Sequence, residues 1–421
     1  MRSTAFTFLL ALTATCLATV AGPTAARAGD NWPSFRGPTG DGHSDSQGLP
    51  LTWSETENVK WKTPIDGKGW SSPVVWNGQI WLTTAPEDGK KLRAICVDFK
   101  SGKILHDKVV FAPAEPQFCH AMNSYATPTP AIEAGRVYVH FGVHGTACLD
   151  TKTGKTLWSR DDLPCNHFRG PASSPIIHGD LLHVNFDGFD LQYVVALDKA
   201  TGKTVWKRDR GDVYTATDGD AKKAYSTPQI VEYGGRTQLI SPGASATMAY
   251  DPESGEQLWI VKHGGMNASA RPLFGLGKVF INTGAGGLNL FAVRPDGSGD
   301  VTDTHIEWKC NKGVPTRSSQ LLIDDLIYMV SDSGIGSCIE AETGESVWQK
   351  RLGENDCASP IYADGRIYFF DEAGTAVVLA PGRKYDELAR NKLDAGFMAS
   401  PAVSGKSLIL RTKTHLYRIA E

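Results

Sequence analysis

The sequence predicts an all-β fold, an eight-bladed β-propeller of four-stranded antiparallel blades. Three observations predict it. A turn motif recurs in register, a second motif recurs eight times at intervals of 40 to 57 residues, and the two chain ends carry incomplete units that complement each other. Repeats of this length are typical of solenoids, propellers and arrays. Because a propeller grows by adding blades, we expect one folded domain despite the length of 421 residues.

The turn motif joins the end of one strand to the start of the next. In its clearest copy an acidic residue, a glycine and a tryptophan stand at Asp150, Gly154 and Trp158. One such match is weak, but several in register indicate an internal repeat. Further copies with the same offsets begin at Asp198, Asp251 and Glu340, and a weaker copy begins at Asp98 and ends in His106.

The second motif gives the period of the repeat. A small residue followed by proline opens a short apolar run, and a turn with Gly or Asp follows. Between this motif and the tryptophan there is room for three short strands, and the tryptophan begins a fourth, which makes one propeller blade. The prolines are Pro73, Pro130, Pro175, Pro228, Pro272, Pro360 and Pro401, and Gln320 takes the proline position in the remaining copy.

Residues 1–28 are typical of a secretory signal peptide. Arg2 is the charged start, residues 6–12 form the apolar core, and Ala26-Arg27-Ala28 is a small-x-small cleavage site. A membrane anchor would need a longer apolar run. Cys16 suggests lipidation as an alternative, although the residues before it lack the usual leucine. We therefore expect an exported protein of the periplasm, the cell envelope or the medium, without a transmembrane segment.

Residues 29–57 are rich in Pro, Gly and Asp and are predicted to form an ordered N-terminal arm. The single propeller domain then spans residues 58–421. Its first piece carries Trp61 at the tryptophan position of a fourth strand, but no first three strands precede it. Residues 400–419 supply three strands without a fourth. The N-terminal strand should therefore complete the last blade and close the ring, which leaves no free sheet edge.

Charge and composition exclude one class of partner. The formal net charge is −3, 21% of the residues are charged, and no basic run occurs. Nucleic acid is therefore not an expected partner. We expect a monomer.

The repeat resembles the pyrroloquinoline-quinone-like (PQQ-like) propeller repeat, whose Ala-x-Asp-x-x-Thr-Gly-x-x-x-Trp motif docks each blade on its neighbour. The resemblance covers nearly all of the chain after the arm. It implies the fold of the quinoprotein alcohol dehydrogenases, which bind the quinone with calcium. It equally implies the fold of the propeller lipoprotein of outer-membrane assembly, which binds no cofactor. Fold does not choose between these functions. The tryptophans to which the resemblance gives a structural, blade-docking role are Trp61, Trp158, Trp206, Trp259, Trp308 and Trp348.

Loop lengths predict where function lies. The turns after the first and third strands of the blades are mostly short, whereas the loops after the second strands and the crossings between blades are long and polar. In a closed ring these long loops share one face, where small-molecule sites are common. Ligand-binding candidates there are His120, Asn123, His144, Asn166, His167, Arg169, Asp187, Asn267, Arg271, Arg317, Asp332, Asp356 and Asp371.

The residues of this face suggest three chemistries. His120, His144 and His167 suggest a metal site, but their spacing matches no metal motif, so no metal is predicted. A glycan-processing enzyme would need two carboxylates facing each other across the mouth, and no motif pairs the aspartates. The dehydrogenases that the repeat resembles use a Glu/Asn/Asp calcium site, an Asp base, a cation over the quinone and two adjacent cysteines. This chain has no adjacent cysteine pair, so PQQ with calcium is not the favoured cofactor.

The sequence therefore favours an exported binding or scaffold protein, and no catalytic residue is assigned. Its loop-rich face would receive a small ligand, a glycan or an envelope protein. The alternative is a PQQ-dependent oxidoreductase that acts on alcohols or sugars. Two cysteine pairs in adjacent blade crossings could form disulfides in an exported protein or remain free. These pairs are Cys119 with Cys165 and Cys310 with Cys357.

Overall fold

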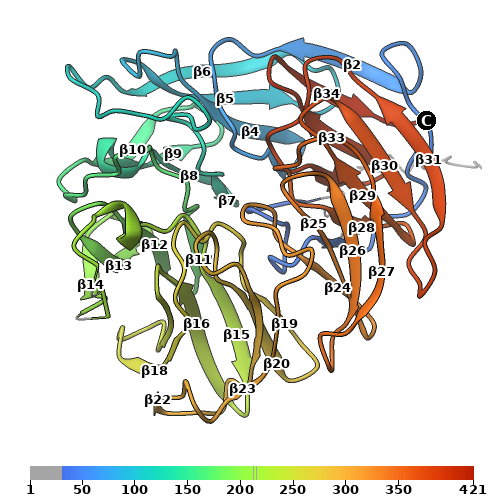
Figure 1. Ribbon diagram of the computed structural model, residues 1–421. Coiled ribbons are helices and arrows are strands. Elements are labelled where there is room, and N and C mark those ends of the chain that lie inside the picture. Colours follow the sequence, from blue (N-terminus) through green and yellow to red (C-terminus); the bar gives the residue numbers. More distant parts are fainter. Residues whose placement is uncertain (1–30, 212, 215) are drawn as a thin grey trace, which may run out of the picture.

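The computed structural model describes residues 31–211, 213–214 and 216–421. The predicted signal peptide, residues 1–28, and the first two residues of the arm lie outside the described residues. Eight β-sheets are arranged around a central axis, as Figure 1 shows. This confirms the predicted eight-bladed, all-β propeller. No helix within the described ranges is long and apolar enough to cross a membrane.

Each of the first seven blades is formed by four strands that follow in chain order from the axis outward. Blades one and two contain β3 (Val74–Trp76), β4 (Gln79–Thr84), β5 (Leu92–Asp98), β6 (Ile104–Phe111), β7 (Ala131–Glu133), β8 (Arg136–His140), β9 (Thr146–Asp150) and β10 (Thr156–Arg160). Blades three and four contain β11 (Ile176–His178), β12 (Leu181–Asp187), β13 (Gln192–Asp198), β14 (Thr204–Asp209), β15 (Gln229–Tyr233), β16 (Arg236–Pro242), β17 (Ala246–Tyr250) and β18 (Gln257–Lys262).

The later blades follow the same order. Blades five and six contain β19 (Leu273–Gly275), β20 (Lys278–Asn282), β21 (Leu290–Val293), β23 (Ile306–Cys310), β24 (Leu321–Ile323), β25 (Leu326–Val330), β26 (Ile335–Glu340) and β27 (Ser346–Arg351). Blade seven contains β28 (Ile361–Ala363), β29 (Arg366–Phe370), β30 (Thr375–Leu379) and β31 (Glu387–Lys392). Blade eight contains β32 (Ala402–Ser404), β33 (Ser407–Arg411), β34 (His415–Ile419) and β2 (Val59–Pro64). Four short elements complete the chain: β1 (His43–Ser44), β22 (Gly299–Asp300) and the 3-10 turns η1 (Gly142–His144) and η2 (Asp220–Lys222).

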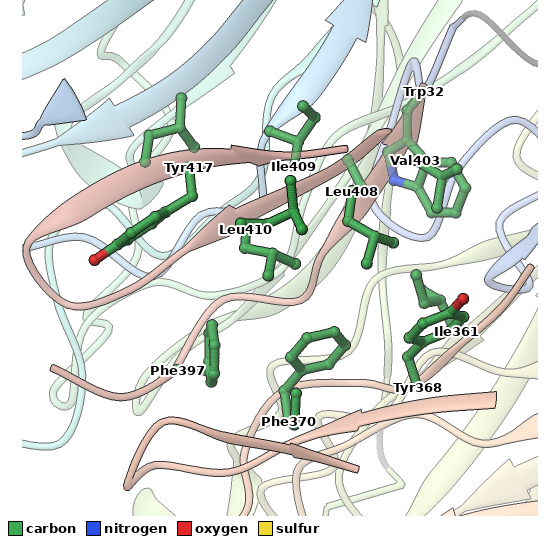
Figure 2. Close-up of a cluster of buried hydrophobic side chains, with 14 of the residues drawn as sticks. Trp32, Ile361, Tyr368, Phe370, Phe397, Val403, Leu408, Ile409, Leu410 and Tyr417 are labelled. Atoms are coloured by element: carbon green, nitrogen blue, oxygen red, sulfur yellow. The ribbon is translucent and has the colours of Figure 1, made fainter. Parts of the chain in front are cut away.

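The N-terminal strand closes the ring as predicted. Strand β2 pairs antiparallel with β34, the last strand of the chain. A large apolar cluster continues from this blade into blade seven and reaches Trp32 of the arm (Figure 2). Closure therefore joins the two chain ends through both backbone pairing and buried apolar area, which is the main favourable term in folding.

The turn motif is held by its own side chains. The Oδ1 atom of Asp150 accepts hydrogen bonds from the backbone N–H and the hydroxyl of Thr153, both at 2.7 Å. Gly154 then takes a positive φ of 64°, and a register shift before Trp158 marks a β-bulge. Glycine adopts this backbone conformation without the Cβ penalty of other residues. The Asp-x-x-Thr-Gly pattern therefore encodes the turn locally.

The tryptophan of most copies of the motif reaches the turn of the next blade. The Nε1 of Trp158 donates to the carbonyl of Lys199 at 3.0 Å, and a Cβ at Gly202 would lie only 2.5 Å from the indole ring. Trp259 differs: its Nε1 bonds Gln238 of its own blade, because β22 runs along β18 and the turn in blade five is long. The other blade-to-blade Nε1 bonds join Trp61 to Phe99, Trp206 to Pro252, Trp308 to Ala341 and Trp348 to Gly382.

A second blade-to-blade contact encircles the axis at the small-Pro motif. The backbone N–H of the residue before the proline position donates to the side-chain hydroxyl at the equivalent position of the next blade. We call these positions the hydroxyl ring. Arg271 interrupts the ring of hydroxyls in blade five. The bonds run from Ser72 to Thr129, Thr129 to Ser174, Ser174 to Thr227, Arg271 to Ser319, Ser319 to Ser359 and Ser359 to Ser400, at 2.8 to 3.0 Å.

Removing one acceptor of the hydroxyl ring should destabilise the propeller. Thr129→Val keeps the shape of the side chain but leaves the buried N–H of Ser72 without its acceptor. An unsatisfied buried donor costs about 1–3 kcal/mol, so the free energy of unfolding in urea should fall by that amount. Thr129→Ser keeps the acceptor and should lose only about 1 kcal/mol for the missing methyl group. Equal losses in the two variants would contradict a role for the hydrogen bond.

The N-terminal arm lies across the inner strands at the face of the short turns. Trp32 pairs with Val75 of β3, and β1 runs parallel to β28 of blade seven. The guanidinium of Arg36 is 2% exposed and donates to the carbonyls of Gln320 and Pro360 at 2.7 and 2.8 Å. The arm therefore fills the centre of the ring at one end and connects blades that are far apart in sequence.

Candidate functional site

A cavity lies on the axis, at the face opposite the arm, where the blade crossings converge. Its volume is about 370 Å³, and Phe35 of the arm lies at its base. In every blade the residue two positions before the hydroxyl-ring position lines it. These eight equivalent residues differ in chemistry: Trp70, Thr127, Ala172, Tyr225, Ser269, Arg317, Cys357 and Met398. We call this cavity the central pocket. Of the eight, only Arg317 is among the candidates predicted from sequence.

One wall of the central pocket contains polar groups that the protein leaves unsatisfied. Arg169 donates through Nη2 to Asp220 at 2.5 Å, while its buried Nε has no partner among the described residues. The buried Oδ1 of Asn267 also has no partner there, although the Asn267 N–H donates to the carbonyl of Lys223 at 2.7 Å. Burial raises the pKa of Tyr225, which lines the same wall. Both unsatisfied atoms are buried inside this wall and are not exposed to the cavity.

The opposite wall holds charges that are already paired. Arg317 lies 3.4 Å from a carboxylate oxygen of Asp332 and 3.2 Å from one of Glu372. Asp332 also accepts a 3.0 Å bond from the Thr316 N–H and a bond from the Thr316 hydroxyl. Burial raises the pKa of the Cys357 thiol to about 12, so this cysteine is protonated near neutrality. Paired charges and a neutral thiol leave this wall without a free ionic group.

The structure brings only part of the predicted candidates together at the central pocket. One of them, Asn123, also has a structural role. Its amide donates to the carbonyls of Arg169 and Pro171, and its Oδ1 accepts a hydrogen bond from the Thr127 hydroxyl. The lining candidates are His120, Asn123, Arg169, Asn267, Arg317 and Asp332. The candidates that lie elsewhere are His144, Asn166, His167, Asp187, Arg271, Asp356 and Asp371.

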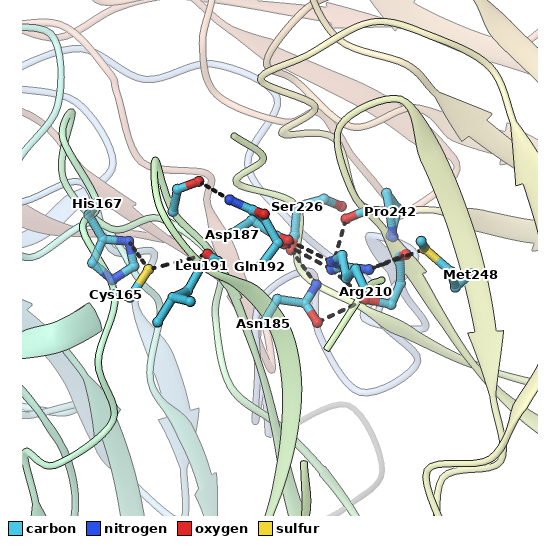
Figure 3. Close-up of polar contacts among 12 residues, drawn as sticks. Cys165, His167, Asn185, Asp187, Leu191, Gln192, Arg210, Ser226, Pro242 and Met248 are labelled. Carbon is cyan, nitrogen blue, oxygen red and sulfur yellow. Dashed lines mark hydrogen bonds and ion pairs between the residues drawn. The ribbon is translucent and has the colours of Figure 1, made fainter. Parts of the chain in front are cut away.

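Asp187 is committed to a buried ion pair with Arg210 within blade three. Its carboxylate accepts from Arg210 at 2.5 and 2.8 Å, and both side chains are almost fully buried (Figure 3). Arg210 also donates to the carbonyl of Ser241 at 3.1 Å and to its hydroxyl at 2.9 Å. Asn185 joins the same network by accepting the Ser241 hydroxyl at 2.9 Å. This network joins two blades and leaves Asp187 no oxygen for a ligand.

Arg271 faces the arm instead of the mouth. Its Nη1 donates to the carbonyl of Phe35 at 2.5 Å, and its Nε donates to Pro228 at 3.1 Å. Burial beside Arg36 lowers the pKa of Arg271 to about 9. Arg271 therefore holds the arm in place.

Asp356 and Asp371 are neighbours in a buried backbone bridge. The Oδ1 of Asp371 accepts from the N–H groups of Ala373 and Thr375 at 3.0 and 2.7 Å. Burial, together with the Asp371 charge, raises the pKa of Asp356 well above its ordinary value. Asp332 is the only one of the four weighed aspartates at the central pocket, so the two facing carboxylates of a glycan-processing site are not found there.

The three histidines that suggest a metal site lie in different surroundings. His120 lines the central pocket, His144 lies against the Tyr125 ring, and His167 is buried beside Phe186. Across residues 31–421, excluding the two undescribed positions, no cluster of His, Cys, Asp and Glu is suited to a metal ion.

The cysteines are free thiols throughout the part of the chain that the structure describes, so neither weighed disulfide is formed. Cys119 and Cys165 contact other groups. The Cys119 sulfur lies 3.9 Å from the carbonyl oxygen of Arg169, and the Cys165 sulfur lies 3.8 Å from Nδ1 of His167.

The residues present do not fit a calcium-bound quinone. A hard cation takes several free oxygen ligands, mainly carboxylates and carbonyls. Asp187 is occupied by Arg210, and Asp332 by Thr316 and Arg317. PQQ itself carries carboxylates, whereas Arg169 and Arg317 at the pocket are already paired with acids. The central pocket is better suited to a neutral ligand.

Comparisons with known proteins agree with this fold. The family described as outer membrane protein assembly factor BamB matches residues 52–209 and 190–420. Quinohemoprotein alcohol dehydrogenase from Comamonas testosteroni superposes with a TM-score of 0.67 at 11% identity, over 93% of this chain and 81% of that chain. BamB from Moraxella catarrhalis superposes with a TM-score of 0.59 at 13% identity, over 86% and 99%.

A europium-containing methanol dehydrogenase gives a TM-score of 0.65 at 13% identity, over 92% of this chain and 90% of that chain. No curated protein matches the chain. At these identities the structural likeness shows the fold alone. The structures of BamB and of the dehydrogenases share this fold, so the chemistry of the site must decide between their functions.

Proposed function

This chain belongs to the family described as outer membrane protein assembly factor BamB, and from that premise we propose that it is an exported binding protein of the cell envelope. Its central pocket receives a ligand or a partner's side chain, and no reaction is assigned to it. The N-terminal signal pattern supports export, and the outer-membrane association in the family's description supports the envelope.

The observation that carries this proposal is the ring of eight equivalent pocket positions. A position whose role is only structural carries the same type of residue in most blades, as the Ser and Thr residues of the hydroxyl ring do. The positions two residues earlier carry aromatic, thioether, thiol, hydroxyl, methyl and guanidinium groups, and all converge on the same 370 Å³ cavity. Ligand sites combine apolar walls with a few placed polar groups, and they lie in cavities of about 300–1,000 Å³.

We expect compounds that bind the central pocket to depend on Trp70 and Asn267. A fragment collection screened by ligand-observed NMR should give hits whose affinity falls about ten-fold or more in Trp70→Ala, because buried aromatic contacts dominate such sites. Asn267→Ala should weaken the hits that contact this residue of the cavity lining. Leu157→Ala, an exposed apolar residue on β10, and Asn311→Ala, an exposed amide, are the matched controls.

Calorimetric titration with PQQ, with and without calcium, distinguishes the proposed binding protein from the alternative, a PQQ-dependent oxidoreductase. The paired charges of Arg169 and Arg317 predict no tight, calcium-dependent binding. Tight, calcium-dependent binding of PQQ would favour the oxidoreductase hypothesis over the proposed one. In the fragment screen, the absence of any Trp70-dependent hit would contradict the proposed binding function.

A further inference from the structure

A further cavity lies on the opposite face of the propeller, between the N-terminal arm and the inner strands β7, β11 and β15 of blades two, three and four. We call it the arm cavity. Its volume is about 270 Å³, below the range of about 300–1,000 Å³ that is typical of pockets for drug-sized ligands. It shares no lining residue with the central pocket, and Arg271 of blade five forms part of its wall. The arm cavity is therefore a separate site of a size that suits a small ligand.

Arg271 departs from the repeat at this cavity. It stands at the hydroxyl-ring position, which carries Ser or Thr in the other seven blades. With arginine there, the backbone N–H of Thr227 in the preceding blade donates no hydrogen bond among the described residues. The exchange of a hydroxyl for a guanidinium therefore costs the ring one hydrogen bond, and blade packing does not explain it.

The guanidinium of Arg271 uses only part of its donors within the protein. Its Nε donates to the carbonyl of Pro228 at 3.1 Å and its Nη1 to the carbonyl of Phe35 at 2.5 Å. The Nη2 atom makes no hydrogen bond among the described residues, and it is not one of their unpaired atoms without exposed surface. Because the side chain lines the arm cavity, both N–H groups of Nη2 remain accessible to a ligand there.

The buried charge beside the arm cavity is positive. Arg271 is 6% exposed and Arg36 is 2% exposed, and all their hydrogen-bond acceptors in the described chain are backbone carbonyls. Asp41 is the acid that attracts both guanidinium groups, so two cations face one anion. Glu133, the acid of the cavity lining, is already paired with Lys199 at 3.1 Å. Buried charges are normally paired, so an anion here would offset the excess positive charge.

The arm adds a backbone donor to the same cavity. Gly40 is buried and lines the cavity, and its N–H makes no hydrogen bond among the described residues. A Cβ at Gly40 would lie 2.5 Å from the Arg271 guanidinium, and φ at this residue is +77°. The arm backbone therefore lies directly against the guanidinium, at a turn of the kind whose free N–H groups bind anions.

We infer that the arm cavity binds a small oxyanion, a carboxylate or an ion such as phosphate or sulfate, on Nη2 of Arg271. The anion compensates the excess positive charge of Arg271 and Arg36. Because the arm forms one wall of the cavity, binding also stabilises the arm in its place. The site lies apart from the central pocket, so this inference does not depend on the proposed function.

Calorimetric titration of the intact protein with acetate, phosphate and sulfate tests the inference. Chloride keeps the ionic strength constant, so that screening is equal in all samples. We expect one-to-one binding of at least one of the three anions. Binding of acetate alone would identify a carboxylate ligand, whereas binding of phosphate or sulfate would identify an inorganic ion. Arg271→Ser should lower the affinity about ten-fold or more, because it removes a charge-assisted hydrogen bond.

Two further variants separate charge from the position of the arm. Arg271→Ser gives blade five the hydroxyl of the other blades, but it also frees the carbonyl of Phe35. Asp41→Asn keeps an oxygen for the Thr39 hydroxyl and the His43 N–H, and it removes the negative charge beside Arg271. It should therefore raise the affinity several-fold. Arg383→Met, at an arginine whose side chain is 54% exposed, should leave the affinity unchanged.

Three results would overturn the inference. The first is that none of the three anions binds to the unmodified protein. The second is that Arg271→Ser binds as tightly as the unmodified protein, which would place the anion elsewhere. The third is weaker binding in Asp41→Asn, which would show that the net charge of the site does not drive binding.

Discussion

Acidification from about pH 7.5 to about pH 5.5 should lower the free energy of unfolding by at least about 4 kcal/mol. Three buried histidines account for this amount, and His263, whose pKa burial lowers to about 4, adds to it. Burial lowers the pKa of His140 and of His183 to about 3, and it lowers the pKa of His167 well below its ordinary value. In the unfolded chain each imidazole titrates near pH 6.5.

The sign follows from which state binds protons first. Below about pH 6.5 the histidines of the unfolded chain become protonated, whereas the buried histidines of the folded protein stay neutral. Their full contribution to the free energy of unfolding is therefore present above this pH, and it is lost as the pH falls toward the pKa values of the folded state. Each histidine contributes about 1.4 kcal/mol at pH 5.5. Urea denaturation at several pH values measures the total.

His183→Phe isolates one of the three contributions. Neither ring nitrogen of His183 has a partner among the described residues, and the ring packs 5.6 Å from that of Trp206. The variant should therefore keep its stability at pH 7.5 within about 1 kcal/mol and should lose about 1.4 kcal/mol less on acidification. An unchanged pH dependence in this variant would show that His183 is not the group that titrates.

Asp187→Ala should destabilise the propeller by about 3–5 kcal/mol at neutral pH. The substitution leaves the Arg210 guanidinium buried between blades three and four without its carboxylate (Figure 3). Burying an uncompensated charge costs far more than losing an exposed pair, because water cannot replace the missing partner. The change in urea midpoint at constant slope measures the loss.

A surface pair gives the matched control. Asp162 lies 2.9 Å from Arg160, but its side chain is 68% exposed. Asp162→Ala should therefore cost no more than about 1 kcal/mol. A double variant, Asp187→Leu with Arg210→Met, removes both buried charges and should recover most of the stability. If Asp187→Ala and Asp162→Ala cost the same, the buried pair has no special role in blade contact.

The fold was predictable because its signals are local and repeated. Asp150 and Thr153 close their own turn, and Trp158 stands at a fixed offset from it. Such contacts depend on residues that are near in sequence or at equivalent positions of the next repeat. The incomplete sets of strands at the two ends also predicted closure of the ring, because an open blade would expose a sheet edge.

The site was only partly predictable. Polarity of loop residues predicts Arg169, Asn267 and Arg317, but it does not predict Trp70 and Met398. Aromatic and thioether groups in loops are as readily core residues as ligand contacts. A usable signal was nevertheless present, because each pocket residue stands two positions before the hydroxyl ring. The position relative to the repeat therefore identifies Trp70 and Met398 as pocket residues, whereas their residue type does not.

The sequence by itself determined the number of blades, the closure of the ring and the face that carries the long loops. The tertiary structure decided which polar side chains of that face remain available to a ligand. Asp187 and Arg271 looked equivalent to Arg169 and Asn267 along the chain. In the fold, Asp187 meets Arg210 from 23 residues away and Arg271 meets the arm at Phe35 from 236 residues away. A buried charge must take the partner that packing brings to it, and such long-range partners leave no periodic mark in the sequence.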